Sequence, residues 1–189
     1  MRLSISEAQQ DEMRHAYRDG ALGVLVSGLV WIAAALVSYL FGVERGVWTL
    51  LVGGVFIHPI SAMLTKATGR SGKANANALN QLALASTIWL IICCAMAYGL
   101  YLLKPALFFP AMMATIGSRY LVFASVFGRA LFWIMGASLI AAGCFALLWT
   151  VPPAVAAGLG GLTEIVFGAV LSFKAFKAAP GNCDVFEGM

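Results

Sequence analysis

Six long runs of apolar residues constrain this chain more than any other feature of its sequence. Each run has about 20 to 24 residues and at most one ionisable side chain, and a helix of that length crosses the roughly 30 Å of a bilayer's hydrocarbon core. The runs cover residues 21–41, 46–65, 81–103, 106–128, 130–151 and 153–173. The sequence therefore predicts an all-α, polytopic membrane protein whose six transmembrane helices are arranged as three helical hairpins in one domain, residues 21–173.

A soluble helical protein is the main alternative, and the composition argues against it. Only 11% of the residues are charged, whereas soluble domains have about 25%. Helices that are uncharged around their whole circumference need apolar surroundings on every side, and so short a chain has nothing left to supply them. The net charge of +4 comes mainly from residues at helix ends, without the basic stripe and interleaved aromatics that bind nucleic acid. We therefore expect the lipid bilayer, and no nucleic acid, as a partner.

Arginine and lysine residues beside the runs predict the orientation of the chain. Nine of them flank the runs on the side that holds both ends of the chain, and two, Arg45 and Lys104, flank them on the other. Because positively charged residues concentrate in cytoplasmic loops, this bias places both termini in the cytoplasm. We expect residues 1–20 to form a cytoplasmic N-terminal helix that rests on the headgroups or the bundle, or frays in water, and residues 174–189 to form a flexible cytoplasmic tail.

His58, Arg119 and Glu164 are the ionisable residues inside the runs, one in each even-numbered run. They lie 12, 14 and 11 residues past Gly46, Pro105 and Pro153, which mark the outer ends of their helices. At 1.5 Å per residue, those positions are roughly 16 to 21 Å deep, near the midplane. Since the even-numbered helices run in the same direction, three tandem hairpins would bring these side chains to one level.

The three side chains predict a polar site in the middle of the bilayer. A charge that faces lipid at mid-depth costs at least about 2.5 to 3.5 kcal/mol, so Arg119 and Glu164 should face inward and pair with each other. His58 could add a hydrogen-bond donor or a proton acceptor, because histidine titrates near neutrality. Ser118 and Tyr120, which flank Arg119, complete the candidate site. We interpret it as a substrate or ion site for a proton, an ion or a small polar solute in a small transporter or channel-like protein.

Two other functions are compatible with the same residues. In a non-transporting membrane sensor or assembly component, Arg119 and Glu164 would form a structural pair that fixes the helix register. An intramembrane enzyme would need Ser118, His58 and Glu164 to act as a triad, and it is less favoured because no nucleophile elbow is present. The cysteines lack zinc spacing, His58 is the sole histidine within a run, and no phosphate-binding loop occurs, so we expect no metal, haem or other cofactor.

Glycines one heptad apart indicate close helix contacts in the last two runs. Gly136 with Gly143, and Gly161 with Gly168, would let neighbouring backbones approach closely. Such contacts could lie inside one chain or between the protomers of a homo-oligomer.

Three segments of the sequence carry a resemblance to other proteins. They read GVLVSGLVW at Gly23–Trp31, GVWTLLVGGVFIHP at Gly46–Pro59 and FFPAMMATIGSRYLVF at Phe108–Phe123. These segments are similar to an uncharacterised family of small bacterial multi-pass membrane proteins of unknown function. The resemblance implies a location in the bacterial cytoplasmic (inner) membrane and transfers no activity. His58 and Arg119 lie within the segments, whereas Glu164 lies outside them.

Overall fold

The computed structural model describes residues 7, 10, 13, 14, 20–67 and 78–177. Within them, six long helices account for nearly all residues: α2 (Ala21–Phe41), α3 (Val43–Ala67), α4 (Ala78–Leu103), α5 (Phe108–Phe127), α6 (Ala130–Leu148) and α7 (Pro153–Lys177). A short 3-10 helix, η2 (Pro105–Leu107), joins α4 to α5. All six long helices are long and apolar enough to cross a membrane, so the predicted fold class is confirmed.

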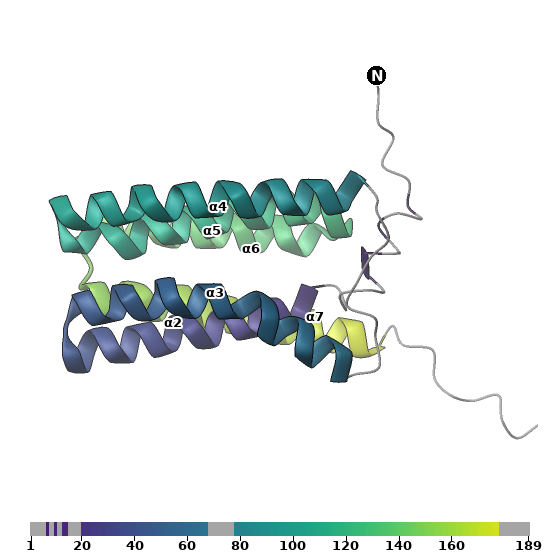
Figure 1. Cartoon of the computed structure of the whole chain (residues 1–189), viewed down its shortest axis with the longest axis horizontal. Helices are drawn as coiled ribbons and strands as arrows, with labels where there is room; N and C mark the ends of the chain where they lie inside the picture. The colour runs from purple at the N-terminus through teal and green to yellow at the C-terminus, as the bar shows by residue number, and fades with distance from the viewer. Residues whose placement is uncertain (1–6, 8–9, 11–12, 15–19, 68–77, 178–189) are drawn as a thin grey trace, which may run out of the picture.

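The helices form two layers of three, seen one above the other in Figure 1. The first layer holds α2, α3 and α7, and the second layer holds α4, α5 and α6. Contacts of α7 with α6 and α5 join the two layers. Each helix contacts its sequence neighbour in a hairpin, but α7 packs far more extensively on α2 than on α6. The start of α2 and the end of α7 therefore lie at the same end of the bundle.

Glycine and proline residues set the ends of several helices. Gly42 and Gly128 end α2 and α5 with φ of 96° and 62°, a left-handed conformation that costs glycine little. The second span was expected to begin at residue 46, after a charged turn. Instead α3 begins at Val43, and Glu44 lies in its first turn, where a carboxylate interacts favourably with the helix N-terminus. At the other end of the chain, α7 continues to Lys177, past the residue at which a tail was expected to begin.

Part of the segment expected to form an N-terminal helix contacts the end of α5. The side chains of Gln10 and Arg14 donate hydrogen bonds to the carbonyl oxygens of Ser125 and Phe127, at 2.9 and 2.7 Å. The last carbonyl groups of a helix have no partner within it, so these donors satisfy them, and the Arg14 charge suits the negative end of the helix dipole. Apart from residues 7, 10, 13 and 14, residues 1–19 lie outside the described residues.

The glycines that predicted close helix contacts pack inside the chain. An added methyl group at Gly136 of α6 would lie 2.6 Å from the carbonyl oxygen of Gly117 of α5. Gly161 and Gly168 of α7 approach the backbone of α2 in the same way, at Ile32 and Leu25. These contacts hold each layer together at backbone distance.

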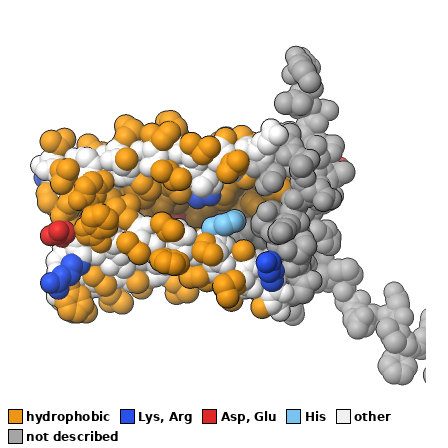
Figure 2. All heavy atoms as spheres, in the orientation of Figure 1, with side chains coloured by type: hydrophobic (Ala, Val, Ile, Leu, Met, Phe, Trp, Pro, Cys, Tyr) orange, Lys and Arg blue, Asp and Glu red, His pale blue; other side chains and the backbone are white. Residues whose placement is uncertain are grey.

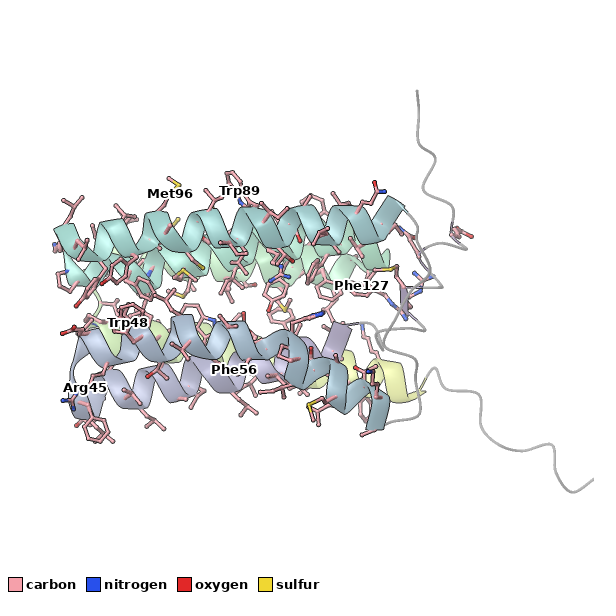
Figure 3. All side chains as sticks on the ribbon, viewed as in Figure 1. Arg45, Trp48, Phe56, Trp89, Met96 and Phe127 are labelled. Carbon is pink, nitrogen blue, oxygen red and sulfur yellow. The ribbon has the colours of Figure 1, made fainter. Side chains whose placement is uncertain are left out.

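By contrast, α3 and α4 are the least buried helices, and their outer surfaces are apolar. Trp89 and Met96 of α4 are 55% and 65% exposed and point away from the bundle (Figure 3). Hydrophobic side chains cover most of the face in Figure 2, as expected for a surface in contact with lipid. The same face is hollowed between α3 and α4, and histidine and Lys or Arg side chains lie within the hollow.

The glycine contacts generate a first prediction, about stability. Gly117→Ala should destabilise the protein by about 1 to 3 kcal/mol, because its methyl group would collide with the backbone of α6. The measurement is the midpoint of unfolding in mixed detergent micelles as the fraction of denaturing detergent rises. Gly99→Ala is the matched control, since nothing lies within 4 Å of a methyl group added there. Equal losses in the two variants would contradict the prediction.

Candidate functional site

The structure places His58, Arg119 and Glu164 in three different surroundings. His58 on α3 is exposed, Arg119 on α5 is half-buried, and Glu164 on α7 is fully buried. They lie on three helices that run in the same direction, as the sequence predicted. Each side chain nevertheless has its own partners, which decide what it can do.

Glu164 lies between the two layers. Its Oε1 accepts a hydrogen bond of 2.9 Å from the Tyr120 hydroxyl, so a side chain of α7 in the first layer is bonded to one of α5 in the second. The hydroxyl group of Ser27 on α2 lies beside both side chains. Gly28 lets α2 approach so closely that an added methyl group there would be 3.2 Å from Glu164 Cβ. We call Ser27, Tyr120 and Glu164 the carboxyl site.

The carboxyl site has unused binding capacity. Glu164 has an exposed fraction of 0%, and its Oε2 has no hydrogen-bond partner among the described residues. Burial of a carboxylate carries a large desolvation cost, and Arg119, which lies within electrostatic range but is not paired with Glu164, offsets only part of it. A proton or a small cation bound between the carboxyl and the two hydroxyl groups would remove that cost.

Arg119 does not form the expected ion pair with Glu164 within the described part of the chain. Its Nη2 donates instead to Thr87 Oγ1 on α4, at 3.0 Å, and its guanidinium lies 5.0 Å from the centre of the Phe123 ring. The reason is geometric, because consecutive residues point about 100° apart around a helix. With Tyr120 directed at α7, the neighbouring Arg119 is directed at α4.

The hydroxyl and imidazole groups of the hypothetical triad are not assembled in this structure. Ser118 Oγ donates to the carbonyl oxygen of Thr115, at 2.7 Å, within its own helix. Glu164 is bonded to Tyr120, and His58 is exposed on α3, where its carbonyl oxygen accepts a hydrogen bond from Ser61.

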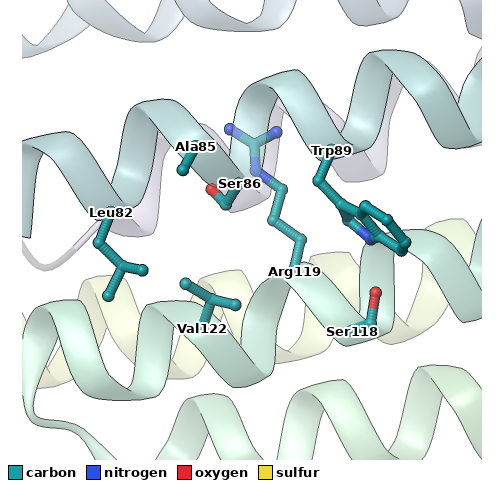
Figure 4. A pocket seen from close by; sticks show the side chains of 7 residues that line it. All are labelled: Leu82, Ala85, Ser86, Trp89, Ser118, Arg119 and Val122. Carbon is teal, nitrogen blue, oxygen red and sulfur yellow. The ribbon is translucent and has the colours of Figure 1, made fainter.

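Arg119 also lines a cavity of about 350 Å³ between α4 and α5 (Figure 4). Its lining is mainly apolar, with two hydroxyl groups and the one cationic side chain: Leu82, Ala85, Ser86, Trp89, Ser118, Arg119 and Val122. This cavity is separate from the carboxyl site, since Glu164 and Tyr120 do not line it.

Sequence reasoning missed Ser27 and Thr87. Both belong to odd-numbered spans, which were treated as uniformly apolar because they carry no ionisable residue. The hydroxyl group of Ser27 lies beside Glu164, and that of Thr87 accepts a hydrogen bond from Arg119. Hydroxyl side chains well inside a span were the available signal, since such groups form hydrogen bonds across helices in membranes.

Comparisons with other proteins identify a family but add no activity. A family model described as a family of unknown function (DUF7010) matches residues 6–174. No curated protein and no solved structure matches the chain.

The contacts of Glu164 generate a second prediction, tested by double-mutant cycles. Tyr120→Phe and Glu164→Leu should show a coupling energy of about 1 to 3 kcal/mol, because either change alone leaves a buried polar group unpaired. Arg119→Leu and Glu164→Leu should show a smaller coupling, because no hydrogen bond joins the two residues among the described contacts. Unfolding in mixed micelles gives both values. A coupling energy that is larger for Arg119 and Glu164 than for Tyr120 and Glu164 would contradict this prediction and indicate an ion pair.

Proposed function

Because the chain belongs to DUF7010, a family of unknown function, we propose its activity from its own geometry: it is a small transporter that moves a proton or a small cation across the membrane. Glu164 would carry the bound charge, with Tyr120 and Ser27 as hydroxyl partners. The observation that supports this proposal most directly is the buried Tyr120–Glu164 hydrogen bond between the two layers. Ionisable residues buried at mid-depth commonly mark such pathways.

The two-layer architecture supports a mechanism of alternating access. Helices within a layer are joined by backbone contacts at glycines, whereas the layers share fewer contacts with each other. A site at the boundary between two such units can open to either side when one unit rocks against the other. The Tyr120–Glu164 bond would break in that motion and form again once the site has closed.

The proposed setting is the bacterial cytoplasmic membrane, with both termini in the cytoplasm. The charge bias supports this orientation: nine arginine and lysine residues flank the spans at one end, against two at the other. A non-transporting sensor or assembly role is the rival, and transport measurements separate the two.

A third prediction tests the role of Glu164 directly. In liposomes that contain a trapped pH-sensitive dye, the protein should speed the decay of an imposed pH or cation gradient, and Glu164→Gln should reduce the rate to that of protein-free liposomes. Glutamine keeps a hydrogen-bond acceptor for Tyr120 but cannot bind a proton or a cation as a carboxylate does. Glu44→Gln is the matched control, because Glu44 is exposed at one end of the bundle, and it should keep the parent rate.

The comparison requires that the Glu164→Gln and Glu44→Gln variants are both folded. Their elution from a size-exclusion column in detergent and their unfolding midpoints establish that they are folded. Gradient decay that is unchanged in a folded Glu164→Gln variant would end the proposal, and a parent protein that moves neither protons nor cations would favour the rival role.

A fourth prediction tests the motion between the layers. A disulfide between cysteines introduced at Met113 of α5 and Gly160 of α7 should stop transport, and its reduction should restore it, because these two positions lie close together and belong to different layers. A methyl group at Gly160 would lie 3.3 Å from Met113 Cγ, close enough for a disulfide once both residues are cysteine. The native cysteines are replaced first.

The control cross-link joins two helices of one layer. A methyl group at Gly23 of α2 would lie 4.0 Å from Ser61 Cβ of α3, so cysteines at these positions can also be bridged. Oxidation of this pair should leave transport unchanged. If both cross-links had the same effect, rocking of the layers would not be the mechanism.

A further inference from the structure

Among the described residues, Arg119 has no ion-pair partner, and it lines an apolar cavity. Glu164 lies within electrostatic range of it but is hydrogen-bonded to Tyr120 instead. Thr87 Oγ1 is the hydrogen-bond acceptor that the described residues provide, and Arg119 Nε is buried without any. A guanidinium has five N–H donors, so this side chain can bind a further acceptor. An anion that accepted those bonds would also offset the cost of a charge at mid-depth, at least about 2.5 to 3.5 kcal/mol.

The cavity opens toward the hydrocarbon layer and not toward water. Leu82 and Trp89, which line it, are 37% and 55% exposed on the outer surface of α4. Trp89 points away from the bundle (Figure 3). Its neighbours Ile88 and Ile91 are 54% and 64% exposed on the same helix, so the surface around the opening is apolar. A ligand that enters here must be soluble in the bilayer, and it must carry a negative group to complement Arg119.

We infer that this cavity binds a single-chain anionic amphiphile, a long-chain carboxylate whose headgroup lies against Arg119 and whose hydrocarbon chain lies along Leu82, Trp89 and Val122. A carboxylate matches the planar fork of a guanidinium. The inference rests on Arg119 and is independent of ion transport through Glu164, so either can fail alone.

The depth of Arg119 favours a single-chain carboxylic acid over a phospholipid. Arg119 lies eight residues from the end of α5 at Phe127 and eleven from its start at Phe108. These separations correspond to about 12 and 16 Å at 1.5 Å per residue. A phospholipid headgroup stays at the interface, beyond reach of that level. A single-chain carboxylic acid enters the hydrocarbon in its neutral form, so its headgroup can reach the level of Arg119, where the guanidinium charge favours the ionised form.

Trp89 provides a reporter for the test, a fifth prediction. The other four tryptophans are replaced by phenylalanine, and the full chain is reconstituted in phosphatidylcholine bilayers. A fatty acid brominated in mid-chain should quench Trp89 fluorescence in a saturable way, beyond the quenching by its methyl ester at the same mole fraction. The ester has the same chain and bromine atoms but no charge, so the excess measures binding through the carboxylate. Arg119→Gln should weaken that binding roughly tenfold or more, as expected for the loss of a charge-assisted hydrogen bond.

A second single-tryptophan chain controls for bromine that is merely dissolved in the bilayer. Trp133 of α6 is 57% exposed, close to the 55% of Trp89, but it does not line the cavity. A chain that retains only Trp133 should be quenched equally by the acid and the ester. If the single-tryptophan chains do not fold, the difference between the parent and its Trp89→Phe variant gives the same signal.

Three results would overturn the inference. The first is equal quenching of Trp89 by the acid and the ester. The second is saturable quenching that survives in Arg119→Gln. The third is excess quenching by a brominated anionic phospholipid that matches the excess by the fatty acid, which would assign the cavity to a membrane phospholipid.

Discussion

The contact between α2 and α7 is the interaction on which the rest of the structure depends. Gly28 of α2 and Gly161 and Gly168 of α7 remove the side chains that would hold the two backbones apart. The same contact seals Glu164 away from the lipid, beneath Gly28. A wider separation of α2 from α7 would expose the carboxyl group to hydrocarbon, and a charged group in contact with hydrocarbon is energetically costly. The close packing of α2 on α7 is therefore also what keeps the Glu164 carboxyl group buried.

The number and type of the helices could be predicted from the sequence because a bilayer imposes a simple rule. Each span must satisfy its backbone internally and present apolar side chains along about 20 residues, and the six long apolar runs obey that rule. The partner of each helix could not be predicted, because α2, α6 and α7 are apolar around most of their circumference, so their sequences do not mark which face is buried. The preference of α7 for α2 depends on backbone fit at glycines, which the sequence indicates only as a tendency.

The ionisable residues of the candidate site could be predicted from the sequence, but the contacts that they make could not. A charge count finds His58, Arg119 and Glu164, but it does not say which helix each side chain faces. The structure shows that Tyr120 forms the hydrogen bond to Glu164, whereas the adjacent Arg119 donates to Thr87 on another helix. The interior of the bundle thus holds two polar groups with different surroundings: a carboxyl group that is fully buried, and a guanidinium group that lines an apolar cavity.

The packing of α7 on α2 also bears on the order in which the protein is assembled. During synthesis α2 leaves the ribosome before the other long helices, yet its most extensive partner, α7, is made after all of them. The glycine-bearing face of α2 must therefore remain in contact with lipid or with the insertion machinery while α3, α4, α5 and α6 are threaded. The first layer is complete only when α7 has been inserted, so until then the surface of α2 around Gly28 lacks the helix that packs on it in the finished protein.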